Sequence, residues 1–97
     1  MSAYVLAQLE FVDIDRYRTY QAAFASVFEA SGAKLLIADE HPTLLEGEWL
    51  GDKVVLMEFP DERQAMSWLQ SPEYQVISED RKAGARTTAL LLRGFGV

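Results

Sequence analysis

One short pattern occurs twice in the chain, once in each half. Leu9-Glu10-Phe11-Val12-Asp13 aligns with Met57-Glu58-Phe59-Pro60-Asp61, and in both places it ends an apolar run and opens an amphipathic segment. The preceding runs, Tyr4 to Gln8 and Lys53 to Leu56, are short and rich in residues that favour β-strands. Each half of the chain is therefore predicted to begin with a strand that leads directly into a helix.

The helices are marked by capping residues as well as by apolar spacing. After Asp13, apolar residues recur at helical intervals up to Gly32, where a left-handed residue can end a helix, so we predict a helix from Ile14 to Ser31. Asp61 resembles the first residue of a capping box, and Ser71-Pro72-Glu73 is a further helix start. The residues expected to face inward are Ile14, Tyr17, Phe24, Val27 and Phe28 in the first helix, Ala65, Trp68 and Leu69 in the second, and Tyr74 and Ile77 in the third.

A further strand is expected after each helical stretch, at Ala33 to Asp39 and at Thr87 to Arg93. The pattern allows the first of them to resume at Leu44 to Trp49, and Leu50-Gly51-Asp52-Lys53 can close a hairpin in which the glycine takes a positive φ. The order βαββαβ predicts an α+β, ferredoxin-like fold, with a four-stranded antiparallel sheet and helices on one face. At this length we expect one domain, residues 1–97.

Alternation along the strands divides the sheet residues between two faces, and both faces are largely apolar. The face expected to meet the helices carries Val5, Ala7, Leu9, Phe11, Val55, Met57 and Phe59. The opposite face carries Tyr4, Leu6, Gln8, Glu10, Val54, Leu56 and Glu58, with Thr88, Leu90 and Leu92 or their neighbours from the last strand. Its area is roughly 440 Å², a size at which an apolar patch indicates an interface. We therefore predict a homodimer through this sheet face.

Charge and composition argue against several classes of function. The formal charge of −6 and the scattered basic residues disfavour nucleic acid and anionic membrane surfaces as partners. No apolar run reaches membrane-spanning length, and Met1 to Phe11 lacks the features of a secretory signal, so a soluble cytoplasmic protein is expected. The chain has no cysteine, which excludes disulfides and thiolate chemistry, and we predict no cofactor and no metal.

Several local motifs extend over almost the whole chain. They are Tyr4-Val5, Asp13, Tyr17, Tyr20, Leu45-Glu46-Gly47-Glu48-Trp49, Glu58-Phe59-Pro60, Ala65 with Trp68, Ser71-Pro72-Glu73-Tyr74-Gln75, Arg81 and Gly94. With these motifs the chain resembles the family catalogued as domain of unknown function 1330. The resemblance implies a dimeric α+β barrel. It leaves the activity open, since similar barrels include cofactor-independent monooxygenases, lactone isomerases and haem-degrading enzymes.

Three residues are candidates for acid–base catalysis. Glu58 and Arg81 fall in motifs of the resemblance, and opposite charges that converge in a partly dry space can bind an acid or orient a substrate. The alternative for both is a structural ion pair near the dimer interface. His41 is the only histidine and can act as a general base, and its alternative is a solvated loop residue.

The candidates for ligand binding are mostly aromatic, because such rings can line a pocket for an aromatic ligand. They are Tyr17, Tyr20, Trp49, Trp68 and Tyr74, together with Glu46. Helical spacing gives Tyr17 and Trp68 an alternative role in the core. The sequence thus leaves three functions open: a homodimer that binds a small organic molecule in a cleft between sheet and helices, a cofactor-independent monooxygenase- or isomerase-like enzyme, and a purely structural or interaction module.

Overall fold

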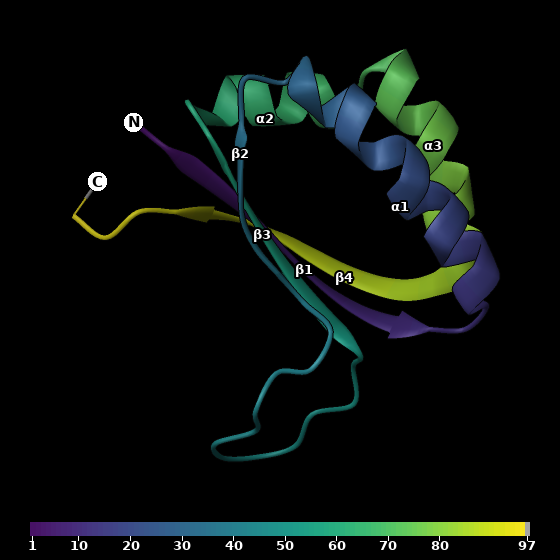
Figure 1. Cartoon of the computed structure of the whole chain (residues 1–97). Helices are drawn as coiled ribbons and strands as arrows, with labels where there is room; N and C mark the ends of the chain where they lie inside the picture. The colour runs from purple at the N-terminus through teal and green to yellow at the C-terminus, as the bar shows by residue number, and fades with distance from the viewer. Residues whose placement is uncertain (97) are drawn as a thin grey trace.

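The computed structural model describes residues 1–96, which form a sheet with helices on one side (Figure 1). The elements are β1 (Ala3–Phe11), α1 (Ile14–Glu29), β2 (Lys34–Asp39), β3 (Lys53–Phe59), α2 (Glu62–Leu69), α3 (Pro72–Gly84) and β4 (Ala85–Arg93). The four strands are antiparallel and are ordered β2-β3-β1-β4. The predicted ferredoxin-like α+β fold is confirmed. No helix in the described part of the chain is long and apolar enough to cross a membrane.

The predicted helix starts are confirmed by their caps. The side chains of Asp13, Asp61 and Ser71 each accept a hydrogen bond from the backbone N–H three residues further on. A cap of this kind stabilises a helix by about 1 kcal/mol. Because α2 and α3 follow one another with a fresh cap between them, the chain changes direction and covers a wider part of the sheet than one helix would.

The first helix ends two residues before the predicted position. The backbone N–H and the side-chain hydroxyl of Ser31 both donate to the carbonyl oxygen of Phe28, at 2.9 and 2.6 Å. These bonds reach back three residues and so end the regular α-helical pattern at Glu29. Gly32 follows with a φ of 73°, in the left-handed region predicted for it.

Two predictions for the segment between β2 and β3, residues 40–52, are wrong. The stretch from Leu44 to Trp49 forms no strand, because the β2–β3 pairing ends at Asp39 and Val54 and the chain between them leaves the sheet as a loop. Gly51 does not have a positive φ. A glycine suits this position because a Cβ there would lie only 2.7 Å from the ring of Trp49 and 3.2 Å from the carbonyl oxygen of Leu9.

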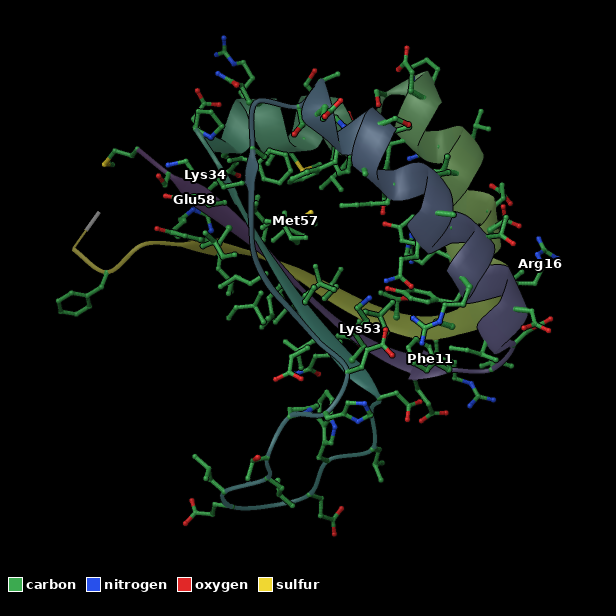
Figure 2. All side chains as sticks on the ribbon, viewed as in Figure 1. Phe11, Arg16, Lys34, Lys53, Met57 and Glu58 are labelled. Carbon is green, nitrogen blue, oxygen red and sulfur yellow. The ribbon has the colours of Figure 1, made fainter. Side chains whose placement is uncertain are left out.

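The strand register confirms the predicted division of the sheet into two faces. Figure 2 shows Met57 on the helix side of β3, whereas its neighbour Glu58 lies on the other side together with Lys34. We call the side without helices the open face. It consists of Tyr4, Leu6, Gln8, Glu10, Lys34, Ile37, Asp39, Val54, Leu56, Glu58, Arg86, Thr88, Leu90 and Leu92.

Candidate binding site

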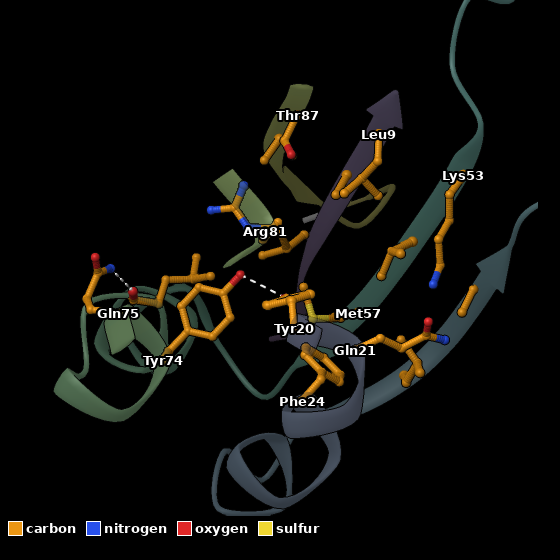
Figure 3. A pocket seen from close by; sticks show the side chains of 17 residues that line it. Leu9, Tyr20, Gln21, Phe24, Lys53, Met57, Tyr74, Gln75, Arg81 and Thr87 are labelled. Atoms are coloured by element: carbon orange, nitrogen blue, oxygen red, sulfur yellow. Dashed lines mark hydrogen bonds between the residues drawn. The ribbon is translucent and has the colours of Figure 1, made fainter. Parts of the chain in front are cut away.

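A cavity of about 300 Å³ lies between the sheet and the helices α1 and α3 (Figure 3). Its floor is a row of small and medium side chains that the strand register places side by side across the whole sheet. From β2 to β4 the row is Ala38, Val55, Ala7 and Ala89. These side chains are too short to fill the space beneath the helices, so the cavity lies where a larger residue would have completed the core.

A β-bulge in β2 brings the first alanine into this row. Leu35 pairs with Met57 on the helix side, but the register shifts by one residue before Ile37, which pairs with Leu56 on the open face. Ala38 is therefore the residue that faces the helices, where uninterrupted alternation would have placed the isoleucine. The bulge replaces a large side chain in the cavity floor by a small one.

The cavity opens to solvent between α1 and β2. Leu35 is 46% exposed although it lines the cavity, and Gln21 on α1, also in the lining, is exposed as well. Deeper in, Met57 is buried and Phe24 and Leu69 are partly buried. A ligand that entered beside β2 would therefore meet an apolar interior.

Two polar atoms in the cavity lining lack a partner. The Nε of Arg81, in the last turn of α3, and the Oγ1 of Thr87, on β4, are buried and make no hydrogen bond to any residue in 1–96. Figure 3 shows both side chains at the same end of the cavity. A buried donor without a partner costs free energy, so this pair is the feature of the cavity that most needs an explanation.

Two tyrosines form a neutral wall next to Arg81. The hydroxyl oxygens of Tyr20 and Tyr74 lie 3.1 Å apart and share a hydrogen bond. Burial raises the pKa of Tyr20 above its ordinary value, and the nearby Tyr74 adds to the effect, so the phenol stays protonated. The ring of Tyr74 is fixed by Trp68, whose ring centroid is 4.3 Å away and whose indole N–H donates to the carbonyl oxygen of Val27.

The end of the cavity near residues 40–52 carries a charged network. Lys53 is only 4% exposed, and its Nζ lies 3.5 Å from a carboxylate oxygen of Glu40 and 4.9 Å from the ring centre of Tyr17. Glu40 also accepts two hydrogen bonds from Arg18, at 2.5 and 2.7 Å. Arg18, with a smaller contribution from Lys53, lowers the pKa of Glu40 to about 2. The buried ammonium group therefore has a permanent counter-charge.

Replacing Glu40 by glutamine is expected to lower the free energy of unfolding by about 1 kcal/mol at pH 7, the scale of a well-formed but partly exposed ion pair. Because the folded-state pKa is depressed, this stabilisation is present above the ordinary value of 4.5 and is lost as the pH falls towards 2. Urea unfolding of both proteins at pH 7 and pH 3 should give a smaller difference at pH 3. Glu46→Gln, at an exposed carboxylate in the same loop, is the control. A difference that does not change with pH would contradict this role of Glu40.

The structure brings only some of the predicted site residues together. Arg81, Tyr20 and Tyr74 line the cavity, and Tyr17 and Trp68 are buried in the core beside it. Glu58 lies on the open face, where its carboxylate accepts a 3.4 Å hydrogen bond from the hydroxyl of Tyr4. The sheet therefore separates Glu58 from Arg81, and the two charges do not converge within one chain.

The remaining predicted site residues lie in the loop 40–52. His41 and Glu46 are exposed, and the backbone N–H of His41 donates to the side chain of Asp39. Trp49 is half-buried beside Glu10 and Arg86, at one end of the open face. Their predicted roles in catalysis and ligand binding stay predictions. Within residues 1–96, no three His, Asp or Glu side chains are close enough to hold a metal ion.

Sequence reasoning missed Thr87, Lys53 and the row of small residues in the cavity floor. One signal was present for Thr87: alternation along β4 places it opposite Leu9, so a hydroxyl faces the helices among apolar neighbours. Lys53 likewise pairs with Leu9 from β3. A polar residue at a position that alternation assigns to the core is therefore the pattern that would have indicated the cavity.

The fold and the cavity together define a ferredoxin-like α+β protein with an accessible space between its sheet and its helices. Residues 2–95 match the family model "Domain of unknown function (DUF1330)", and the chain belongs to this family. The comparison with curated proteins gives no significant match.

Several solved structures have the same fold. A protein of unknown function from Rhodopseudomonas palustris is 17% identical, with a TM-score of 0.82 over 99% of this chain and 84% of the other. A dimeric ferredoxin-like protein of unknown function from Jannaschia sp. CCS1 is 16% identical, with a TM-score of 0.81 over 97% of this chain and 100% of the other. SnoaB, a cofactor-independent oxygenase from Streptomyces nogalater, is 12% identical, with a TM-score of 0.68 over 99% and 95%. At these identities the likeness shows the fold alone.

Proposed function

We propose that the protein binds a small, mainly apolar organic molecule in the cavity between the sheet and the helices. The observation that carries this proposal is the row of small residues across the sheet, which keeps about 300 Å³ free in the place of a core. Ligand sites are typically concave, apolar and lined by a few polar groups, and this volume is at the lower end of their range. A cavity kept open inside a small domain reduces stability, which favours a functional reason for it.

The binding proposal can be tested with a variant that fills the cavity. Ala7 lies in the middle of the floor, and Ala7→Leu should occupy the space without touching the polar groups. We expect aromatic compounds of about ten non-hydrogen atoms to raise the melting temperature of the wild-type protein, since a ligand at about 100 times its Kd stabilises by about 2.7 kcal/mol. The same compounds should have little effect on Ala7→Leu.

Ala22→Leu is the matched control for this test, because Ala22 is exposed on α1 and does not line the cavity. It should respond to ligand like the wild type. Equal ligand effects on Ala7→Leu and wild type would place binding outside the cavity. The absence of any effect from both neutral and ionised aromatic compounds at millimolar concentration would argue for the purely structural role.

A cofactor-independent monooxygenase- or isomerase-like activity is the second candidate. In its favour, Arg81 is a partly buried cation whose Nε faces a largely apolar cavity, a position from which it can stabilise an anion formed when a bound substrate loses a proton. Oxygen uptake measured with oxidisable phenols tests the oxygenase form. Uptake that depends on the protein and is lost in Ala7→Leu would favour the enzyme, and unchanged compound recovered with no uptake would favour binding alone.

We also propose that the protein is a homodimer through the open face. The centre of this face is apolar, formed by Leu6, Ile37, Val54, Leu56, Leu90 and Leu92, and its charged residues lie towards the ends, where Glu10 pairs with Arg86. Figure 1 shows the loop 40–52 extending on the side away from the helices, and three leucines in it, Leu44, Leu45 and Leu50, are exposed. The face and the loop together form a continuous apolar surface that a second copy of the chain would cover.

A charge placed in the open face should disrupt this dimer. Leu90 is 49% exposed and pairs with Leu6, so Leu90→Glu would bury an unpaired carboxylate at the interface while leaving a single chain able to fold. We expect wild type to sediment as a dimer at micromolar concentration and Leu90→Glu as a monomer. Val76→Glu, at a 72% exposed valine on α3, should leave the dimer intact. A wild-type monomer would refute the dimer.

A further inference from the structure

We propose that the ligand of the cavity is an anion, an aromatic monocarboxylate of about ten non-hydrogen atoms whose carboxylate is bound by Arg81 and Thr87. This inference rests on the proposed function, because it specifies the chemical class of molecule that enters the same cavity. It goes beyond apolar binding by assigning a fixed orientation: carboxylate towards α3 and β4, ring towards α1.

The charge of the cavity lining favours an anionic ligand. The chain as a whole has 15 acidic and nine basic residues, yet none of the residues that line the cavity is an aspartate or a glutamate. Two of them, Lys53 and Arg81, are basic. An acidic protein thus has a cavity with a positive lining, and a neutral ligand would not use that charge.

Arg81 differs from the other basic residues of the chain. Six of the nine form ion pairs within residues 1–96: Arg16, Arg18, Lys53, Lys82, Arg86 and Arg93. Of the other three, Lys34 and Arg63 are exposed to solvent. Arg81 alone is both partly buried and without a carboxylate partner within residues 1–96. A ligand carboxylate would supply the missing counter-charge.

The available hydrogen-bond donors match the acceptors of a carboxylate. The Nε–H of Arg81 and the hydroxyl of Thr87 are both free to donate. The Tyr20–Tyr74 pair contains two hydroxyl protons, but their mutual hydrogen bond uses only one of them, so the other can be donated to a ligand. A carboxylate accepts up to four hydrogen bonds and donates none. The ammonium group of a cationic ligand, by contrast, would find no negatively charged acceptor in the cavity lining.

Lys53 is not the anion site, although it also lines the cavity. Its ammonium group lies 3.5 Å from Glu40, whose pKa is lowered to about 2 mainly by Arg18, so the counter-charge is present at neutral pH. A second carboxylate brought to Lys53 would be repelled by Glu40. The end of the cavity at Arg81 has no such acidic group in its lining.

The rest of the cavity fits a flat apolar ring. Phe24, Met57 and Leu69 line it with apolar side chains, and a thioether packs well against an aromatic ring. At about 30 Å³ for each water-sized group, 300 Å³ holds on the order of ten non-hydrogen atoms. Benzoate, salicylate and cinnamate have this size, and each places one carboxylate at the end of a planar body.

Isothermal titration calorimetry of the full chain with matched pairs of probes tests this assignment. Benzoate and cinnamate should bind at least about tenfold more tightly than benzamide and cinnamamide, which have the same shape without the charge. Arg81→Met should weaken binding of the carboxylates about 10- to 100-fold, the scale of a lost charge-assisted hydrogen bond, and Thr87→Val about 5- to 10-fold. Both variants should bind the amides like wild type.

The controls separate this inference from the proposed function. Arg63→Met removes an exposed arginine on α2 and should leave all affinities unchanged. Amides that bind as tightly as carboxylates, or carboxylate binding unchanged in Arg81→Met, would overturn the anion site while leaving the cavity as a binding site. Failure of both classes to bind wild type would overturn both proposals. If Arg81→Met does not fold, the Thr87→Val result and the wild-type carboxylate-to-amide ratio decide.

Discussion

Replacing Gly84 by alanine is expected to lower the free energy of unfolding by about 3 kcal/mol, at the upper end of the usual cost of overpacking. Gly84 is the last residue of α3 and is buried against the start of α1. A Cβ at this position would lie 2.4 Å from the backbone nitrogen of Tyr17 and 2.9 Å from the carbonyl oxygen of Asp13. Both are backbone atoms, so no change of side-chain rotamer can relieve the overlap.

The same glycine also supplies a hydrogen-bond acceptor that fixes the two helices to each other. Its carbonyl oxygen accepts from the backbone N–H groups of Val12 and Asp13, at 2.8 and 3.0 Å. Moving α3 away to make room for a methyl group would lengthen both bonds and shift Asp13, which caps α1. The expected loss therefore combines steric overlap with weakened hydrogen bonds at one crossing point.

Urea denaturation gives the test, with the midpoint and slope measured for each variant. Ala83→Gly is the matched control, because it exchanges the same two residue types at the neighbouring exposed position of α3. It should cost at most about 1 kcal/mol, through the low helix propensity of glycine. Because alanine is the better helix former, helix propensity alone would make Gly84→Ala slightly stabilising, so an unchanged or raised urea midpoint for Gly84→Ala would contradict the close approach of α1.

Most of the fold was predictable because its signals are local. The repeat around Phe11 and Phe59 marks the point where a strand leads into a helix, and the caps at Asp13, Asp61 and Ser71 act within three residues of themselves. The alternation of side chains along β1 and β3 then identified which of their residues face the helices and which face the open side of the sheet. The end of the second strand at Asp39 was predicted correctly. The further strand predicted at Leu44 to Trp49 was wrong, because strand formation there depends on a pairing partner that the local sequence does not show.

The candidate site was predictable only in part, because the cavity depends on how distant residues align. Three strands contribute Ala7, Ala38 and Ala89 to one row, and the bulge in β2 decides that Ala38 rather than Ile37 belongs to it. No pattern within β2 alone identifies a bulge. The separation of Glu58 from the cavity did follow from alternation, so its proposed convergence with Arg81 could have been rejected from the sequence.

Replacing Phe59 by alanine is the second change with a large expected effect, a loss of about 3 to 5 kcal/mol. Phe59 is 0% exposed, and its ring lies 5.8 Å from that of Trp68 and 6.4 Å, edge-on, from that of Phe28. Deleting it leaves a hole among rings that the surrounding helices can fill only partly. A domain of this size has about 5 to 15 kcal/mol of total stability, so the variant should be studied at low temperature.

Phe59→Ala is also informative about the cavity, because Phe59 belongs to the core and does not line the binding space. It should lower the urea midpoint strongly and leave the affinity for benzoate within about twofold of wild type, provided the measurement is made where the variant is folded. Ala7→Leu should do the reverse, with binding lost and stability kept. Phe95→Ala, at an exposed phenylalanine, should change neither quantity. A preformed site and a packed core are distinct only if each can be altered without the other. If Phe59→Ala weakened benzoate binding strongly as well as lowering the urea midpoint, the space beneath the helices would be a packing defect in one continuous core.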